Sequence, residues 1–185
     1  MNKQHNEESV VLIRDVNGIT IPDGAHITLE KGQIVTIYQS LGSNYTVFSE
    51  AGRMLRIAGF DADALGKEAT QTTTISSDTD AKTVEANAWE VMRTVFDPEI
   101  PVNIVELGLV YYCRVTPIDA GKNRVEVAMT LTAPGCGMGP VIQQDVERLI
   151  QELPGVERVN VEVVFDPPWS QDMMSEVAKL ELGML

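Results

Sequence analysis

Two kinds of hydrophobic pattern divide the chain. From about Ser9 to Ala64, short apolar runs rich in β-branched residues are broken by polar positions, and no helical period appears. Residues 33–40 and 45–49 alternate most clearly, which is typical of half-buried strands. Dipeptides that end in glycine interrupt the runs, and we expect hairpin turns there: Asn17-Gly18, Asp23-Gly24, Lys31-Gly32 and Ala51-Gly52. The pattern predicts a small antiparallel barrel or sandwich of about four to six strands.

A polar stretch then separates this part from the rest. Residues 66–80 read GKEATQTTTISSDTD, which is rich in Thr and Ser and holds one large apolar residue, Ile75. Such a composition is typical of a linker, because it offers little surface to bury. The sequence therefore predicts three parts: a β-rich N-terminal domain over 1–65, a linker over 66–80 and an α/β domain over 81–185.

After the linker the hydrophobic spacing changes to that of helices and longer strands. Asp80 is placed to cap a helix whose apolar positions recur at helical spacing: Val84, Ala88, Val91, Met92 and Val95. We expect strands over 107–117 and 123–134, a helix over 139–155 with Pro140 in its first turn, and a strand over 156–168. Ser170 is then expected to cap a last helix that ends before Gly183. The order α-β-β-α-β-α predicts a three-stranded mixed sheet, formed by a hairpin and a crossover through the second helix, and the whole chain belongs to the α+β class.

Composition and charge argue against several classes of function. The formal net charge of −13 argues against nonspecific binding to nucleic acid or to anionic membranes. No apolar run approaches the ~20 residues of a membrane helix, and the first residues do not resemble a signal peptide. Two cysteines give no disulfide framework, so we expect a reducing, cytoplasmic location.

The stretch LTAPGCGMGPV, residues 131–141, holds the sharpest candidate for chemistry. Cys136 stands among three glycines and before a predicted helix. Glycines allow several backbone N–H groups to converge, and a helix N-terminus adds positive potential, so both features stabilise a thiolate, which is the nucleophilic and metal-binding form. The alternative is that the glycines only make a tight turn and that Cys136 packs as a small apolar residue.

Other candidates are weaker. Cys113 shares a strand face with Leu109, Tyr111 and Val115, which favours core packing over chemistry. The acidic loop DPEIPVNIVELG supplies Asp97, Glu99 and Glu106, whose carboxylates can bind metal or orient a partner. In the alternative reading Asp97 shapes a turn and Glu99 is simply solvated.

Several familiar sites are missing from the sequence. The two histidines, His5 and His26, are too scattered to complete a triad or a closed zinc site with the cysteines. GCGMGP lacks the GK[ST] of a P-loop and the spacing of a GxGxxG motif. Ordinary catalysis is therefore weakly supported.

The C-terminal stretch DPPWSQDMMSEVAKLELGML also stands out. Its prolines predict an extended exit from the last strand, and a Met-rich apolar set follows: Met173, Met174, Val177, Leu180 and Leu182. These residues can close a helix over the sheet, since methionine fills irregular gaps, or they can form an adaptable docking surface.

Three motifs in order resemble a known family. DPEIPVNIVELGLVY, LTAPGC and the strand that enters DPPW are similar to the small iron–sulfur assembly domain of SufT-type proteins, which is related to PaaD and to cytosolic iron–sulfur targeting factors. The resemblance covers about Asp80 to Leu185. IPDGAHITLEKGQIVTIYQSLGSNYTV and RIAGFDADALG are similar to the extra N-terminal region of longer SufT-type proteins. Many relatives have proline after the cysteine, where this chain has Gly137.

The resemblance implies an iron–sulfur cluster assembly and maturation factor, not an enzyme, that helps deliver clusters to client apo-proteins. The family's reactive cysteine corresponds to Cys136, which would be an exchangeable ligand of a transient iron–sulfur cluster or a reactive contact. The family's acidic positions correspond to Asp97, Glu99 and Glu106, which are candidate metal ligands. Because a cluster usually takes four ligands, the others would come from a second protomer in a homodimer, a client, a carrier or a small thiol.

Two further hypotheses remain open. The chain can be a metal-free adaptor that docks clients to the iron–sulfur assembly machinery, through the glycine loop and the C-terminal helix. It can also be a thiol enzyme that uses Cys136, although no motif provides the base that such an enzyme needs. The expected partners are assembly scaffold or carrier proteins and client apo-proteins, with no nucleic acid and no membrane.

Overall fold

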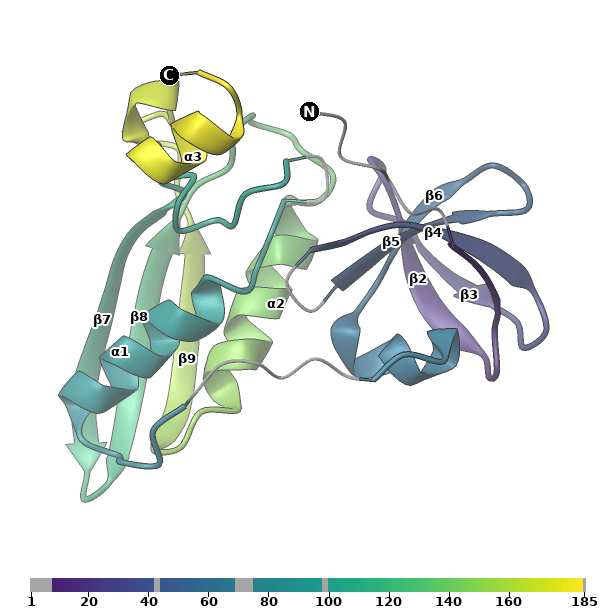
Figure 1. Cartoon of the computed structure of the whole chain (residues 1–185). Coiled ribbons are helices and arrows are strands. Elements are labelled where there is room, and N and C mark those ends of the chain that lie inside the picture. The colour runs from purple at the N-terminus through teal and green to yellow at the C-terminus, as the bar shows by residue number, and fades with distance from the viewer. Residues whose placement is uncertain (1–7, 42–43, 69–74, 98–99, 185) are drawn as a thin grey trace. The chain divides into compact units, whose positions relative to one another are not determined.

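A computed structural model of the chain describes residues 8–41, 44–68, 75–97 and 100–184 (Figure 1). Two compact units divide at Thr72–Thr73. The chain is of mixed α+β class, with a six-stranded antiparallel sheet in the first unit and a three-stranded mixed sheet in the second. The α+β class expected from the sequence is therefore confirmed. No helix among the described residues is long and apolar enough to span a membrane.

The first unit is a single sheet in the order β1-β4-β5-β6-β2-β3. Its elements are β1 (Glu8–Val11), β2 (Val16–Thr20), β3 (His26–Leu29), β4 (Ile34–Leu41), β5 (Asn44–Ser49), β6 (Met54–Ile57) and the 3₁₀ helix η1 (Gly59–Leu65). Alternation along β4 and β5 sends one set of apolar side chains inward. Val47, Leu55 and Ile57 are fully buried there, together with the alanines of η1.

An ion-pair cluster fixes η1 to the loop between β1 and β2. The Arg14 guanidinium donates to Asp61 at 2.8 Å and to Asp63 at 2.7 and 2.6 Å. These hydrogen bonds raise the pKa of Arg14 and lower the pKa of Asp63. Because the Asp63 carboxylate is exposed, water screens most of this attraction, so the cluster sets the local geometry more than the stability.

Three of the four expected turns lie between strands. Gly24, Gly32 and Gly52 all have positive φ values at strand connections. The prediction of a hairpin turn at Asn17-Gly18 is wrong, because Gly18 lies inside β2 and pairs with Ile27 on one side and Ile57 on the other. A Cβ at this position would lie 3.3 Å from Leu55, so the glycine serves close strand packing rather than a turn.

The second unit follows the element order that its hydrophobic spacing predicts. Its elements are α1 (Ala81–Met92), β7 (Val110–Asp119), β8 (Lys122–Met129), α2 (Gly139–Gln151), β9 (Val156–Val163), the 3₁₀ helix η2 (Gln171–Met173) and α3 (Glu176–Glu181). β7 pairs antiparallel with β8, and β8 pairs parallel with β9. α1 packs on β7 and α2 on β9, and both helices cover the same face of the sheet (Figure 1).

Two predicted helix starts had different outcomes. The Asp80 carboxylate accepts a hydrogen bond from the Thr83 N–H at 3.1 Å, which lowers the pKa of Asp80 and confirms it as the cap of α1. Ser170 does not cap the last helix, which is a correction: η2 comes first, Met174 is extended, and Ser175 caps α3 by accepting from Ala178 N–H at 3.1 Å. Before α3 begins, the Trp169 indole donates to the Leu107 carbonyl, and the Pro167 carbonyl accepts from the Tyr111 hydroxyl.

The end of the predicted linker is held by the second unit. The Asn87 side chain bonds the Ser76 backbone in both directions, at 2.9 and 3.2 Å. The Asn123 amide donates to the carbonyls of Thr79 at 2.8 Å and Gly155 at 3.0 Å. Two buried asparagines therefore fix the approach to α1, although composition alone describes these residues as linker.

Candidate functional site

The loop that holds Cys136 follows the end of β8. We call residues 130–138 the cysteine loop. Its ends are fixed: the Thr130 N–H donates to the Leu109 carbonyl at 2.7 Å, and Met138 is buried. Gly139 begins α2 and packs so closely on Leu131 that a Cβ there would overlap the leucine side chain. The loop is therefore anchored at both ends.

Between these two fixed ends, Cys136 is partly exposed to solvent. It is half-buried, and Gly135 and Gly137 on either side are exposed. Gly135 has φ +82°, a conformation that favours glycine. The Cys136 N–H donates to the Ala133 carbonyl at 3.4 Å, and its own carbonyl accepts from the Gly139 N–H at 3.1 Å. The backbone is thus held by local bonds while the thiol is available to a ligand.

Helix α2 starts directly after the loop. Its N-cap is Met138, whose side chain offers no cap hydrogen bond, and proline occupies its first turn. The first N–H groups of a helix carry positive potential, which favours an anion close by. Cys136 lies three residues before the first residue of this helix.

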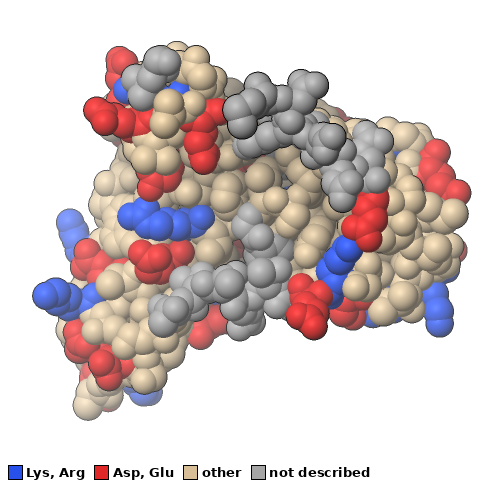
Figure 2. All heavy atoms as spheres, viewed as in Figure 1, with Lys and Arg blue, Asp and Glu red and all other residues tan. Residues whose placement is uncertain are grey.

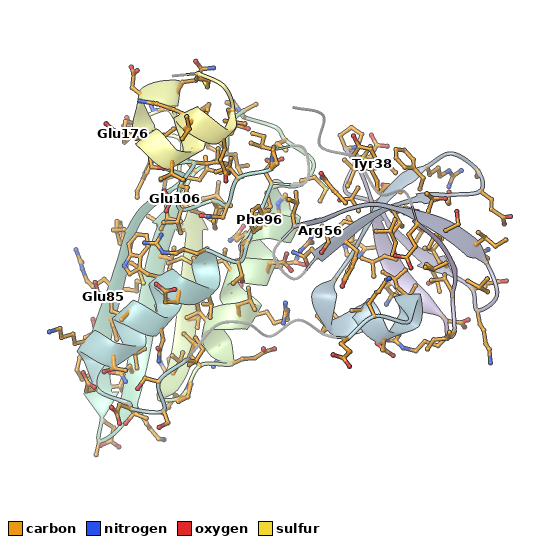
Figure 3. All side chains as sticks on the ribbon, viewed as in Figure 1. Tyr38, Arg56, Glu85, Phe96, Glu106 and Glu176 are labelled. Carbon is orange, nitrogen blue, oxygen red and sulfur yellow. The ribbon has the colours of Figure 1, made fainter. Side chains whose placement is uncertain are left out.

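Cys113 lies in the core, as expected from its strand position. It is buried on β7 beneath the helices. Burial, with a smaller contribution from the Glu85 carboxylate on α1 (Figure 3), raises the pKa of the Cys113 thiol from 9.0 to about 12. A thiol that stays protonated is a poor nucleophile and a poor metal ligand. The two cysteines therefore have different chemistry available to them.

The predicted acidic ligands have varied surroundings. Glu99 lies outside the described residues. Asp97 is buried, and its carbonyl accepts from the Ile100 N–H at 3.2 Å, so the residue takes part in a turn. The Glu106 carboxylate accepts from Arg93 at 3.0 Å, and Figure 3 places Glu106 below α3. Its charge is therefore already compensated.

The described residues do not combine these side chains into a metal site. No three His, Cys, Asp or Glu side chains among them lie close enough together to hold a metal ion. Cys136, Asp97 and Glu106 therefore do not form a ligand group by themselves. Of the histidines, His26 is exposed on β3, and His5 lies outside the described residues.

A second loop at the same end of the sheet makes unusually close contacts. We call residues 106–109 and 167–175 together the clasp. The Trp169 indole donates to the Leu107 carbonyl at 2.8 Å, and the Ser175 N–H donates to the Glu106 carbonyl at 2.9 Å. A Cβ on Gly108, which has φ +72°, would overlap the Met173 backbone. The clasp joins the ELG motif to the DPPW motif.

The sequence patterns do not predict the clasp, although two aromatic residues with polar atoms indicate it. Tyr111 donates to the Pro167 carbonyl at 2.6 Å, as Trp169 does to Leu107. A large aromatic side chain with a polar atom usually finds a hydrogen-bond partner when it is partly buried. Two such residues next to separate motifs could have indicated that the motifs meet.

The docking surface expected at the C-terminus is only partly exposed. Met174 and Ala178 are buried against the domain, whereas Val177 is 58% and Leu180 67% exposed. The apolar set therefore does not form one face. Part of it closes the fold, and part of it is available for contact.

Comparison with known proteins identifies the second unit. Residues 85–163 match the family model described as "Iron-sulfur cluster assembly protein". The chain is 45% identical over 102 residues to the "Fe-S protein maturation auxiliary factor" of Porphyromonas gingivalis, covering 55% of this chain and 92% of that protein. It is 46% identical over 90 residues to the "Fe-S protein maturation auxiliary factor SufT" of Staphylococcus aureus, covering 49% and 98%.

A solved structure shares this part of the fold. It is described as "Domain of Unknown Function DUF59" from Bacillus anthracis, with a TM-score of 0.51 and 36% identity, and the match covers 57% of this chain and 96% of that one. The match to these relatives is nearly complete over their own lengths. The chain belongs to the iron–sulfur cluster assembly protein family.

Proposed function

We propose that the protein is an iron–sulfur cluster maturation factor that helps to deliver clusters to client apo-proteins, with Cys136 as the exchangeable ligand or reactive contact. Membership of the family and the names of its relatives support the general role. A protein named "Iron-sulfur cluster carrier protein", from Synechocystis, is 35% identical over 83 residues, which cover 22% of its length.

The observation that carries the proposal is the contrast between the two cysteines. Cys136 is half-exposed on an anchored loop before a helix N-terminus, while Cys113 is buried and held protonated. Only the first is exposed enough to contact a cluster held by another molecule. A cluster is cargo here, bound and then surrendered.

One thiolate needs help to hold a cluster, which usually takes four ligands. The described residues supply no further group of ligands beside Cys136. We propose that the remaining ligands come from a second protomer, a carrier, a client or a small thiol. Asp97, Glu99 and Glu106 stay candidate ligands, and Glu106 would first have to leave Arg93.

Anaerobic reconstitution with ferrous iron, sulfide and a small thiol tests the cluster role. The full chain should develop a visible charge-transfer band, and Cys136→Ser should lose it. Cys113→Ala is the matched control, because it removes the other thiol and should keep the band. A Cys136→Ser protein that keeps the full band would contradict the assignment.

Function in cells gives a second test. Cys136→Ser should fold normally but fail to restore the activity of iron–sulfur enzymes in a strain that lacks the protein, whereas Cys113→Ala should restore it. Full restoration by Cys136→Ser would exclude an essential role for this thiol.

A metal-free adaptor is the second candidate. Two observations favour it: the pairing of Glu106 with Arg93, and the exposure of Val177 and Leu180 on α3. An adaptor would bind clients equally well with Cys136→Ser and would lose binding with Val177→Asp and Leu180→Asp. Client capture by these variants separates the two candidates. A thiol enzyme ranks last, because no base accompanies Cys136 in the sequence.

We also propose that the chain has two domains, 1–65 and 81–185, joined by a linker over 66–80. The two compact units support this division, and the hydrogen bonds of Asn87 and Asn123 indicate that residues 76–80 act with the second domain. A cytoplasmic location stays a prediction.

A further inference from the structure

One face of the three-stranded sheet lies opposite the helices. A row across the three strands is buried on the helix side: Cys113, Val127 and Val161. Side chains alternate along a strand, so the neighbouring residues on each strand belong to the opposite face. That face, which we call the open face, is formed by these residues: Tyr112, Arg114, Thr116, Arg124, Glu126, Ala128, Arg158, Asn160 and Glu162.

The open face carries positive charge at one end. Arg124 on β8 lies directly opposite Arg158 on β9, and both are exposed. Like charges at opposed positions destabilise a sheet unless an anion compensates them. Arg124 has a distant contact with Glu126, at 3.9 Å, and Arg158 forms no ion pair with the described residues. An arginine pair of this kind is unexpected in a chain of net charge −13. Figure 2 shows that the helix side carries acidic residues with a few basic ones among them.

The other end of the open face is acidic and hollowed. A groove of about 700 Å³ lies there, lined by Gly108, Val110, Tyr112, Ala128, Glu162 and Asp166 among others. Glu162 and Asp166 are exposed and form no ion pair with the described residues around them. The apolar lining suits the methylene stem of an arginine, while the two carboxylates suit its charged group.

The middle of the face is balanced. Arg114 lies opposite Glu126, and its guanidinium is 5.5 Å from the centre of the Tyr112 ring. Asn160 completes this row on β9. The open face is therefore basic at one end, neutral in the middle and acidic at the other end.

We propose that the open face binds the open face of a second copy of this chain. A two-fold axis that runs across the strands, between two stacked sheets, reverses the strand direction. It therefore places the Arg124–Arg158 pair of each copy opposite Glu162 and Asp166 of the other. On β9, Arg158 and Glu162 are four residues apart, or about 13 Å. In the dimer, the arginines of each copy enter the groove of the opposite copy. The occupant is a second copy because one face offers both members of each pair.

The small area of the open face limits the affinity of the proposed dimer. Three strands about 4.8 Å apart give a contact smaller than that of a stable obligate dimer. The dimer is therefore weak, and salt weakens it further because it depends on exposed charges. The cysteine loops follow the ends of β8, so this arrangement holds them at opposite ends. The inference does not rest on the cluster role of Cys136, and such a dimer would not share one cluster between its two copies.

Sedimentation velocity of the full chain over a range of concentrations tests the proposal. At low salt the chain should form a reversible dimer. One variant reverses the basic end, with Arg124→Glu and Arg158→Glu, and another reverses the acidic end, with Glu162→Lys and Asp166→Lys. Each alone should raise the dimer dissociation constant about tenfold or more. An equimolar mixture of the two variants should restore dimers, because one face is then acidic and the other basic.

The control is Glu147→Lys, a charge reversal at one exposed site of α2 on the helix side. It should leave the dissociation constant unchanged, and circular dichroism should show every variant folded. A chain that stays monomeric at its highest soluble concentration overturns the proposal. So does a dimer that neither reversal weakens, or a mixture that does not associate.

Discussion

The clasp and the cysteine loop lie at the same end of one sheet and are built in opposite ways. The start of β7 and the ends of β8 and β9 meet there, since β7 is antiparallel to β8 and β9 is parallel to it (Figure 1). In the clasp, Gly108 has no room for a Cβ, and Trp169 donates to a buried residue's carbonyl. In the cysteine loop, nothing lies within 4 Å of a Cβ built on Gly135, and Cys136 is half-exposed.

The difference separates two tasks. The clasp fixes the chain before β7 and after β9, so it holds the end of the sheet in one shape. The cysteine loop uses that support at Leu109, whose carbonyl accepts from Thr130, and then leaves its thiol accessible. A residue that must exchange a ligand needs access more than contacts, and the loops beside it supply the rigidity.

The largest expected effect is a substitution in the clasp. Gly108→Ala should lower the free energy of unfolding by about 3 kcal/mol or more, because the new methyl group meets the Met173 backbone and the left-handed φ is strained. Gly135→Ala in the cysteine loop has the same kind of φ and open space around it, so it should cost about 1–2 kcal/mol. Urea unfolding measures both. Equal costs would remove the distinction between the two loops.

A smaller effect is expected when the clasp loses one hydrogen bond. Trp169→Phe leaves the carbonyl of buried Leu107 without its indole donor, which should cost about 1–2 kcal/mol. Trp89→Phe on α1 is the matched control, because the Trp89 indole makes no hydrogen bond to the described residues. The two variants should differ by the value of the hydrogen bond in thermal or urea unfolding. If Trp89→Phe costs as much, ring packing rather than the bond holds the clasp.

The burial of Cys113 should make the free energy of unfolding depend on pH. The pKa of Cys113 is about 12 in the fold against 9.0 when exposed, so above pH 9.0 the unfolded thiol loses its proton while the folded one keeps it. Stability that is fully present below pH 9.0 is therefore lost as the pH rises toward 12, by up to about 1.4 kcal/mol per pH unit. Unfolding at neutral pH and at increasing alkaline pH should show a shallower decline for Cys113→Ala. Identical slopes in the two proteins would contradict the burial effect.

The smallest effect on stability is expected at Cys136. Cys136→Ser should change the free energy of unfolding by less than about 0.5 kcal/mol, because the side chain is half-exposed and the change is small. Iodoacetamide under native conditions should modify Cys136 and leave Cys113 untouched, and both should react after unfolding. Mass spectrometry of the digested protein reads the sites directly. Rapid labelling of Cys113 in the folded protein would show that its strand opens.

Sequence patterns predicted local structure well where local forces decide it. Asp80 caps α1 because a carboxylate can reach an N–H three residues on, whatever lies around it. The hairpin and the crossover of the second unit follow from the spacing of apolar residues and the length of the connections. The same reasoning failed at Asn17-Gly18, where pairing with two neighbouring strands outweighs the turn preference of the dipeptide.

The features of the candidate site also divide into those that neighbours along the chain decide and those that tertiary packing decides. The sequence by itself determined that Cys136 lies among glycines before a helix and that Cys113 belongs to a buried strand, because both follow from neighbours along the chain. Only the tertiary structure decided that Glu106 pairs with Arg93, that Trp169 closes on Leu107, and that Arg124 faces Arg158 across the open face. These contacts join residues that are distant in the chain, and strand register and loop packing bring them together.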